Sequence, residues 1–288
     1  MELNLYDSAT VERLLKKHGF SFSKALGQNF IIDGSVCPEM AEQLGADSTT
    51  GVLEIGPGIG VLTRELCKRA GRVVCVELDT RLLPLLGETL GDFSNLEIVN
   101  GDIMKLDLKA LIDEKFKGCS SVKVCANLPY YITSPVIMTL LESGLPIDEI
   151  VVMVQREAAE RLCAETGTRA SGAVTVAVDY YGKSEVLFGV GRESFMPPPK
   201  VDSAVIRITP RKNGCLRVDD EKAFFTLVKA AFSQRRKTLV NSLSSSGIQK
   251  DRLLGALDRL GITPTARAES LTTENFIQLY KELKRYES

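Results

Sequence analysis

The sequence has no tryptophan and a single histidine, His18, among its 288 residues. Seven cysteines are present, but no two of them lie three positions apart, so the spacing that marks zinc sites and redox pairs is missing. Several cysteines stand inside apolar runs, Cys75 among them, and we expect them to be reduced core residues. One histidine and no cysteine pair argue against a histidine-based triad and against a bound metal.

Long hydrophobic runs are missing as well. No segment approaches the 18 consecutive apolar residues of a membrane-spanning helix, and the first 20 residues carry charges throughout instead of the apolar core of a signal peptide. The composition, 44% hydrophobic and 25% charged, is that of an ordinary globular protein. We expect a cytoplasmic protein with no membrane partner, and we expect it to be a monomer.

The whole chain has no large excess of one charge, since its formal net charge is −1. Its two parts, in contrast, carry opposite excesses. Residues 209–288 carry 15 Lys and Arg against 9 Asp and Glu, whereas residues 1–208 carry 21 against 28. A basic C-terminal part favours contact with nucleic acid, although a chance spread of surface charge explains the same numbers.

Short runs rich in Val, Leu and Ile alternate with helix-like stretches in the first 163 residues. A charged amphipathic stretch at 7–18 predicts a first helix. The strands predicted after it are 52–55, 72–78, 96–100, 122–127 and 149–154. The helices between them are predicted at 62–70, from about 81, from Ser134-Pro135 and near 157–163. Strands that alternate with helices predict a parallel sheet covered on both faces.

The pattern changes after residue 172. Three strand-like segments, 173–181, 185–190 and 201–208, follow without a long helix between them, and antiparallel strands that finish the sheet fit them best. From residue 219 the pattern is helical, with helices predicted at 221–233, 236–243, 250–260 and 273–286. Pro210 and Gly214 punctuate a polar linker. We therefore predict an α/β domain over residues 1–208 and a small all-helical domain over residues 209–288.

Distinctive residues follow the first four predicted strands. A glycine loop, Gly56-Pro57-Gly58-Ile59-Gly60, follows the first strand, and Glu77, Asp102 and Asn127 follow the next three at intervals of 21, 25 and 25 residues from Gly56 onward. The carboxyl ends of parallel strands share one edge of a sheet, where ligands bind. Glycines let the backbone approach a ligand closely, and Glu77 is placed to accept from ribose hydroxyls. The loop alone is also compatible with a plain tight turn.

The glycine spacing distinguishes between cofactors. A dinucleotide site needs G-x-G-x-x-G, whereas here the third glycine arrives one residue early and the acidic Glu54 precedes the loop. This pattern resembles the first motif of S-adenosylmethionine methyltransferases and predicts their Rossmann-like fold. A nicotinamide dehydrogenase is the disfavoured alternative.

The tetrapeptide Asn127-Leu128-Pro129-Tyr130 predicts the reaction. It matches the motif of enzymes that methylate exocyclic amino nitrogens, whose lone pair is delocalised into the ring. The Asn127 oxygen and the carbonyl of Leu128 or Pro129 are each expected to accept one hydrogen of adenine N6, which frees the lone pair. Tyr130 is expected to stack on the extruded base, and Phe195 to stack on it from the other side. The plain alternatives are an ordinary Asn-x-Pro turn and a core phenylalanine.

Five motifs, in this order, make the sequence similar to the KsgA/RsmA family over about residues 21–282. They are residues 26–30 (LGQNF), 54–58 (EIGPG), 127–130 (NLPY), 195–203 (FMPPPKVDS) and 231–239 (AFSQRRKTL). The resemblance implies an S-adenosylmethionine-dependent enzyme that dimethylates N6 of two adjacent adenines in the 3′-terminal hairpin loop of small-subunit (16S) rRNA. It also implies a role in small-subunit biogenesis.

Carried over residue by residue, the resemblance implies a set of cofactor contacts. These are Asn29, Ile31, Gly56, Gly58, Glu77, Asp102 and Asn127. One position departs from the pattern: the residue after Tyr130 is usually Asn in the family and is Tyr131 here.

The basic residues Lys200, Arg235, Arg236 and Lys237 are candidates for contacts with rRNA phosphates, although a solvated helix face explains the last three equally simply. Two other functions stay open. Erm-type methyltransferases, which modify an adenine of large-subunit rRNA, resemble the N-terminal motifs equally well. A chiefly non-catalytic assembly factor for the immature small subunit is the other alternative.

Overall fold

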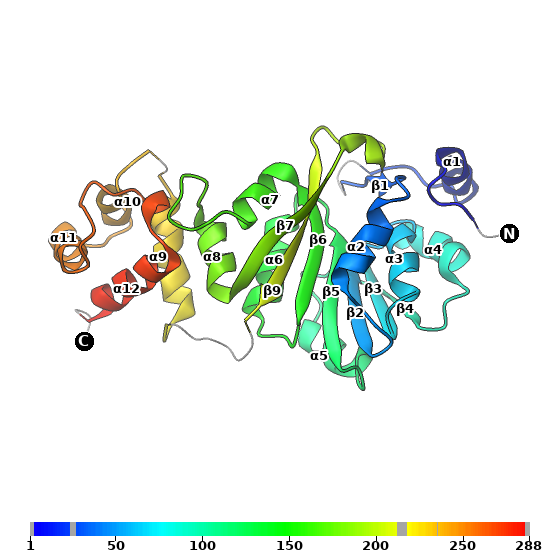
Figure 1. Ribbon diagram of the computed structural model, residues 1–288, viewed down its shortest axis with the longest axis horizontal. Helices are drawn as coiled ribbons and strands as arrows, with labels where there is room; N and C mark the ends of the chain where they lie inside the picture. Colours follow the sequence, from blue (N-terminus) through cyan, green and yellow to red (C-terminus); the bar gives the residue numbers. More distant parts are fainter. Residues whose placement is uncertain (1–2, 24–26, 212–217, 235, 286–288) are drawn as a thin grey trace. The chain divides into compact units, whose positions relative to one another are not determined.

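A computed structural model describes residues 3–23, 27–211, 218–234 and 236–285 (Figure 1). Contacts between Cα atoms divide the chain into two compact units. The first, here called the sheet unit, consists of Met1–Ala159 and Glu185–Pro210, and the second, the helical unit, of Glu160–Ser184 and Arg211–Ser288. The predicted boundary between residues 208 and 209 stays a prediction, since the helical unit also takes in an earlier segment.

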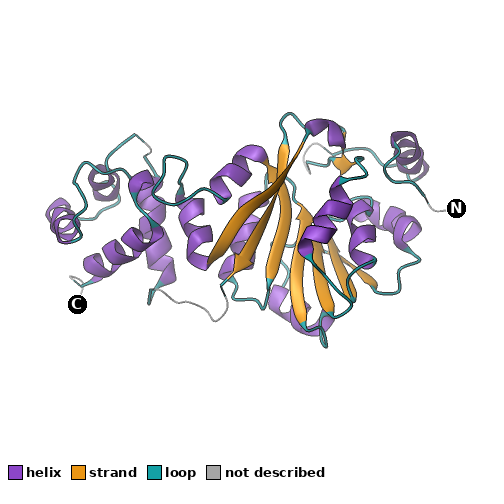
Figure 2. Ribbon diagram, viewed as in Figure 1, coloured by secondary structure: helices purple, strands orange, loops and turns teal. Residues whose placement is uncertain are grey.

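A seven-stranded mixed sheet forms the centre of the sheet unit (Figure 2). Its order is β4-β3-β2-β5-β6-β9-β7. The bounds are β2 (Thr50–Ile55), β3 (Arg72–Glu77), β4 (Leu96–Asn100), β5 (Ser121–Asn127), β6 (Glu149–Gln155), β7 (Gly182–Val190) and β9 (Ser203–Pro210). The five strands from β4 to β6 are parallel, and β9 runs antiparallel to β6. The expected α/β class with a mostly parallel sheet is therefore confirmed.

The chain forms helices before and between these strands, and a separate two-stranded sheet pairs β1 (Phe30–Ile31) with β8 (Phe195–Met196). The helices are α1 (Ser8–Lys17), α2 (Val36–Leu44), α3 (Val61–Cys67), α4 (Leu83–Leu90), α5 (Leu108–Lys115), α6 (Thr133–Glu142) and α7 (Arg156–Leu162), with short 3-10 turns at Thr80–Leu82 and Arg192–Ser194. Helix α1 begins where predicted because the Asp7 carboxylate accepts the Thr10 N–H at 2.9 Å. Helices α2 and α5 and strands β1 and β8 were not predicted.

The segment 173–181 corrects one prediction: it is helix α8 (Ala173–Tyr181), not a strand. Its three valines favour a strand locally, but the helix buries Val176, Ala177 and Val178 in succession, so its apolar residues do not form a one-sided stripe. The Thr175 hydroxyl closes the start of the helix, accepting the Gly172 N–H at 2.9 Å. The other two predicted strands are confirmed as the C-terminal part of β7 and as β9.

In the helical unit, helix α8 packs against aromatic residues of other helices, and the described residues of this unit form four helices besides α8. These are α9 (Glu221–Phe232), α10 (Leu239–Ser244), α11 (Lys250–Arg259) and α12 (Thr273–Lys284), with a 3-10 turn at Ala268–Ser270. The Tyr180 ring of α8 lies 5.3 Å from Phe224 of α9, centroid to centroid. Helix α10 begins later than the predicted residue 236 because Thr238 caps it, accepting the Asn241 N–H. No helix among the described residues has the length and apolar character needed to cross a membrane.

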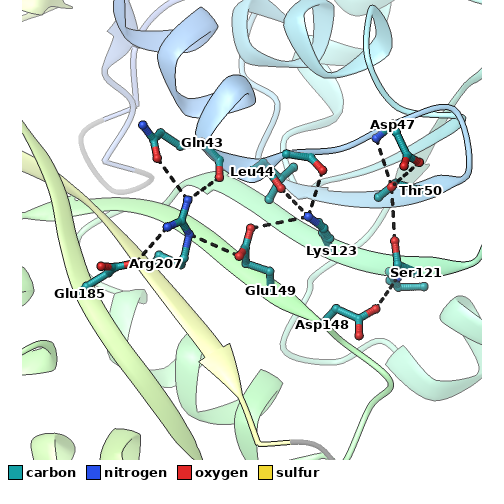
Figure 3. Close-up of polar contacts among 12 residues, drawn as sticks. Gln43, Leu44, Asp47, Thr50, Ser121, Lys123, Asp148, Glu149, Glu185 and Arg207 are labelled. Atoms are coloured by element: carbon teal, nitrogen blue, oxygen red, sulfur yellow. Dashed lines mark hydrogen bonds and ion pairs between the residues drawn. The ribbon is translucent and has the colours of Figure 1, made fainter.

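Two cations fix the C-terminal end of α2 to the sheet (Figure 3). Arg207 of β9 donates to the Gln43 carbonyl at 2.6 Å, and Lys123 of β5 donates to the Leu44 carbonyl at 2.6 Å. The Glu149 carboxylate of β6 lies between them, 3.3 Å from Arg207 Nε and 3.7 Å from Lys123 Nζ. Cations at the C-terminus of a helix complement its dipole, so this cluster stabilises the position of α2.

Candidate active site

One pocket at the carboxyl ends of β2, β3, β4 and β5 collects the predicted cofactor-binding and base-binding residues. All ten residues predicted to contact the cofactor or the target base line it. They are Asn29, Ile31, Gly56, Gly58, Glu77, Asp102, Asn127, Pro129, Tyr130 and Phe195. They come from six separate parts of the chain, so the fold brings together what the sequence spreads over 167 positions. Their individual roles stay predictions.

The glycine loop has the backbone form that requires glycine. Gly56, Gly58 and Gly60 have φ values of +69°, +60° and +89°, a region that other residues rarely adopt. A Cβ on Gly58 would lie 3.2 Å from the Phe30 ring. The loop thus passes closely beneath Phe30 and delivers the chain to the start of α3 at Val61.

Two carboxyl groups are buried beside this loop. Glu54, at 1% exposure, accepts a hydrogen bond from the Cys75 thiol at 3.2 Å, and Glu77, at 6% exposure, accepts the Asp79 N–H at 2.7 Å. Burial raises the pKa of Glu54 to about 7, and the charge of Glu77 adds to the rise. Burial also raises the pKa of Glu77, against the lowering effect of the backbone N–H groups that it accepts. The sequence pattern marks Glu54 as the acidic residue before the loop that favours S-adenosylmethionine over a dinucleotide, but it does not indicate that the carboxyl group is buried.

Asp102 follows β4 on the same edge. One of its carboxylate oxygens accepts the Met104 N–H at 3.0 Å, and the other lies 3.4 Å from the Lys105 ammonium group. No residue of the described pocket lining is a lysine or an arginine, whereas three are Glu or Asp. A pocket with carboxylates and no internal cation favours a ligand that carries positive charge itself.

The polar atoms of Asn127-Leu128-Pro129 divide clearly between structure and pocket. The Asn127 side-chain N–H donates to the Asn29 carbonyl at 3.3 Å, which leaves the side-chain oxygen as an acceptor. The Pro129 carbonyl already accepts the Ile132 N–H at 3.1 Å and the Thr133 hydroxyl at 3.3 Å. The Leu128 carbonyl has no such bond within the described ranges. Of the two expected carbonyl acceptors, the geometry therefore favours Leu128.

The aromatic residues of the pocket differ in how they are held. The Tyr130 hydroxyl is hydrogen-bonded to the Ser203 hydroxyl at 2.8 Å, and burial raises the pKa of Tyr130. Phe195 is only 2% exposed and stands opposite Ile31 in the β1–β8 pair. Tyr131, in contrast, is 54% exposed.

Further lining residues were missed by reasoning from the sequence pattern. Gln28 is one: its side-chain N–H donates to Asp79 at 2.8 Å, and its oxygen accepts the Ser23 N–H at 2.9 Å. This links the segment before β1 to the segment after β3. Neither periodicity nor spacing marks Gln28, and the only signal was its place in the LGQNF motif.

The predicted RNA contacts lie outside the pocket. Lys200 is exposed in the sheet unit, and Arg236 and Lys237 are exposed in the helical unit. Arg235 lies outside the described residues. Over the described ranges, no group of three or more His, Cys, Asp or Glu residues is arranged to hold a metal ion.

Comparison with known proteins adds a family. A family model described as ribosomal RNA adenine dimethylase matches residues 19–285. The chain is 45% identical over 287 residues to a Geobacillus thermodenitrificans protein named ribosomal RNA small subunit methyltransferase A, with 98% of each chain covered. A Staphylococcus aureus protein of the same name is 43% identical over 287 residues, with 97% of each chain covered.

Two solved structures are similar over most of the chain. A dimethyladenosine transferase from Plasmodium falciparum has a TM-score of 0.74 at 26% identity, covering 89% of this chain and 98% of that one. The 23S rRNA methyltransferase ErmE has a TM-score of 0.67 at 28% identity, covering 88% of this chain and 99% of that one.

Proposed function

The chain belongs to the ribosomal RNA adenine dimethylase family, and we propose that it methylates N6 of two adjacent adenines in the 3′-terminal hairpin loop of small-subunit rRNA. The observation that carries the proposal is the pocket. It combines buried carboxylates beside a glycine loop with two uncommitted acceptors, the Asn127 side-chain oxygen and the Leu128 carbonyl. The small subunit is the target named for the relatives at 43–45% identity.

The charge of this pocket suits S-adenosylmethionine. Its sulfonium and ammonium groups supply the positive charge that the buried Glu77 leaves unbalanced, since Asp102 is paired with Lys105 and burial raises the pKa of Glu54 to about 7. Glu77 is placed to accept from the ribose, and the glycine loop leaves room for the backbone to approach. When bound, the cofactor supplies the electrophilic methyl group.

The residues of the chain prepare the adenine for attack. Asn127 and Leu128 each accept one N6 hydrogen, which draws the amino group out of the ring plane and directs its lone pair at the methyl group. Tyr130, held by Ser203, offers a surface for the base, and Phe195 closes the pocket near Ile31. In the second round the nitrogen carries only one hydrogen, so one acceptor suffices.

A methyl-transfer assay tests this function. Purified protein is incubated with labelled S-adenosylmethionine and with either small subunits that lack the two dimethyladenines or large subunits. We expect label in the small-subunit RNA, at two adjacent adenines. The absence of transfer to small subunits would contradict the proposal.

The large subunit is the competing target because the ErmE structure covers 88% of this chain. Label confined to an adenine of large-subunit RNA would establish that alternative. The chemistry of the pocket serves both targets. Selection between small-subunit and large-subunit RNA must therefore depend on contacts outside the pocket.

A further inference from the structure

We propose that Tyr131 is a stacking surface for the base that flanks the target adenine in the RNA. The inference rests on the proposed function, because it takes single-stranded RNA with an extruded adenine as the ligand. It assigns a specificity role to an exposed residue of the pocket lining.

The charge of the pocket shows why stacking is needed there. RNA carries one negative charge per phosphate, and proteins usually neutralise it with Lys and Arg. The described residues that line this pocket contain Glu54, Glu77 and Asp102 but neither Lys nor Arg. Lys105, which contacts the lining residue Asp102, is paired with its carboxylate. A strand that delivers its adenine here therefore gains no Lys or Arg contact to phosphate from the pocket wall, and at this wall uncharged contacts are left to hold it.

Stacking on an aromatic ring is such a contact, since every base has a π-face. Among the aromatic residues in the described lining, Phe30 and Phe195 are 6% and 2% exposed, and Tyr130 is held by its bond to Ser203. Tyr131 alone of these four is exposed, at 54%. Tyr130 therefore belongs to the pocket wall, whereas Tyr131 lies at the mouth of the pocket.

The Tyr131 ring lies close to the backbone of Gly27. A Cβ built on Gly27 would lie 3.6 Å from Cδ1 and 3.7 Å from Cε1 of Tyr131, so the bare Gly27 backbone lies close to the ring. Gly27 has a φ of +59°, which disfavours any larger residue at this position. A ring supported on one side loses less freedom when a base covers the other side.

The test measures the binding of synthetic hairpin RNAs to the full chain in the presence of S-adenosylhomocysteine. One hairpin is intact around the two adjacent adenines, and others carry an abasic site on the 5′ or the 3′ side of them. We expect Tyr131→Ala to weaken binding of the intact hairpin about 10-fold, and Tyr131→Phe to restore it. The natural protein should bind one of the two abasic hairpins about 10-fold more weakly than the intact hairpin. The Tyr131→Ala variant should bind that abasic hairpin and the intact hairpin with equal affinity.

Two results would overturn the proposal. One is equal binding of the intact hairpin by the natural protein and Tyr131→Ala. The other is a full additional loss when Tyr131→Ala meets each abasic hairpin, which would show that the ring and the base act independently. Urea-unfolding curves that match for the natural protein and Tyr131→Ala show that the variant is folded. Transfer to small subunits is measured separately, so a failure of the proposed function is told apart from a failure at Tyr131.

Discussion

Glu54 lines the candidate active site, and its pKa lies well above that of a free glutamate. The side chain is buried beneath the glycine loop, and burial raises its pKa from 4.5 to about 7. Between these two values the folded chain keeps a proton that the unfolded chain has released. Raising the pH through this window therefore favours unfolding, and the stability linked to Glu54 is lost by about pH 7.

The Glu54→Gln variant tests this linkage. In the absence of ligands, we expect the free energy of unfolding of the natural protein to fall by about 3 kcal/mol more than that of the variant between pH 4.5 and pH 7.5, because glutamine does not titrate. Urea unfolding at several pH values measures the difference. Parallel stability curves for the two proteins would show that Glu54 does not titrate in this range.

Asn127 is expected to act directly on the amino group of the target adenine. Asn127→Ala removes one of the two acceptors for the amino hydrogens, and we expect methyl transfer to small subunits to fall at least about 100-fold. Asn127→Asp keeps an acceptor oxygen while losing the bond to the Asn29 carbonyl, and should lose less activity. Binding to the subunits, measured by filtration or sedimentation, should stay close to natural for both. An equal loss of binding and transfer in Asn127→Ala would show a role in recognition instead.

Secondary structure elements were predictable where one local pattern dominated. The ends of β2 and β5 at Ile55 and Asn127 were predicted from short apolar runs, and β3 ends at Glu77, one residue before the predicted end; these ends position the site. Helix α8 was not predictable, because its valines suit a strand and only long-range burial decides for a helix. Strands β1 and β8 contain two residues each, which is too short for any periodicity.

The cluster of Arg207, Lys123 and Glu149 at the C-terminal end of α2 is expected to stabilise the fold. Arg207→Met leaves the Gln43 carbonyl without this donor and Glu149 with only the longer contact to Lys123, and we expect a loss of about 2 kcal/mol in the free energy of unfolding. Urea unfolding measures it. Lys109→Met is the matched control, because the Lys109–Asp113 pair is largely exposed and should contribute little.

A double variant sharpens this test. If the loss in Arg207→Met comes from stranding Glu149, then adding Glu149→Gln should recover part of it. Losses in Arg207→Met and Lys109→Met of the same size would show that the cluster contributes no more than a surface ion pair.

At the scale of the whole molecule, the chain crosses between its two units more often than its sequence shows. Residues 160–184 belong to the helical unit, to which they contribute α8, and the chain returns to the sheet unit within β7. Membership of a segment in one unit depends on contacts between distant residues, such as Tyr180 with Phe224, which no local pattern reveals. The charge asymmetry between residues 1–208 and 209–288, in contrast, was readable directly from the sequence.

That asymmetry leads to a prediction about RNA affinity. Arg236 and Lys237 are exposed in the helical unit, whereas the pocket belongs to the sheet unit. If both contact phosphates, the double variant Arg236→Ala/Lys237→Ala should bind under-methylated small subunits more weakly and reduce the slope of log affinity against log salt by about 2. Its affinity for S-adenosylhomocysteine should not change, because the cofactor pocket is built without them.

The control removes the same amount of charge from the same unit. Lys222 and Lys229 are exposed on α9, so Lys222→Ala/Lys229→Ala changes the net charge equally. A specific phosphate contact predicts a smaller loss of affinity and a smaller change of slope in this control. Equal effects of the two double variants would mean that the helical unit attracts RNA only through its total charge. Arg236 and Lys237 would then make no specific contact with phosphates.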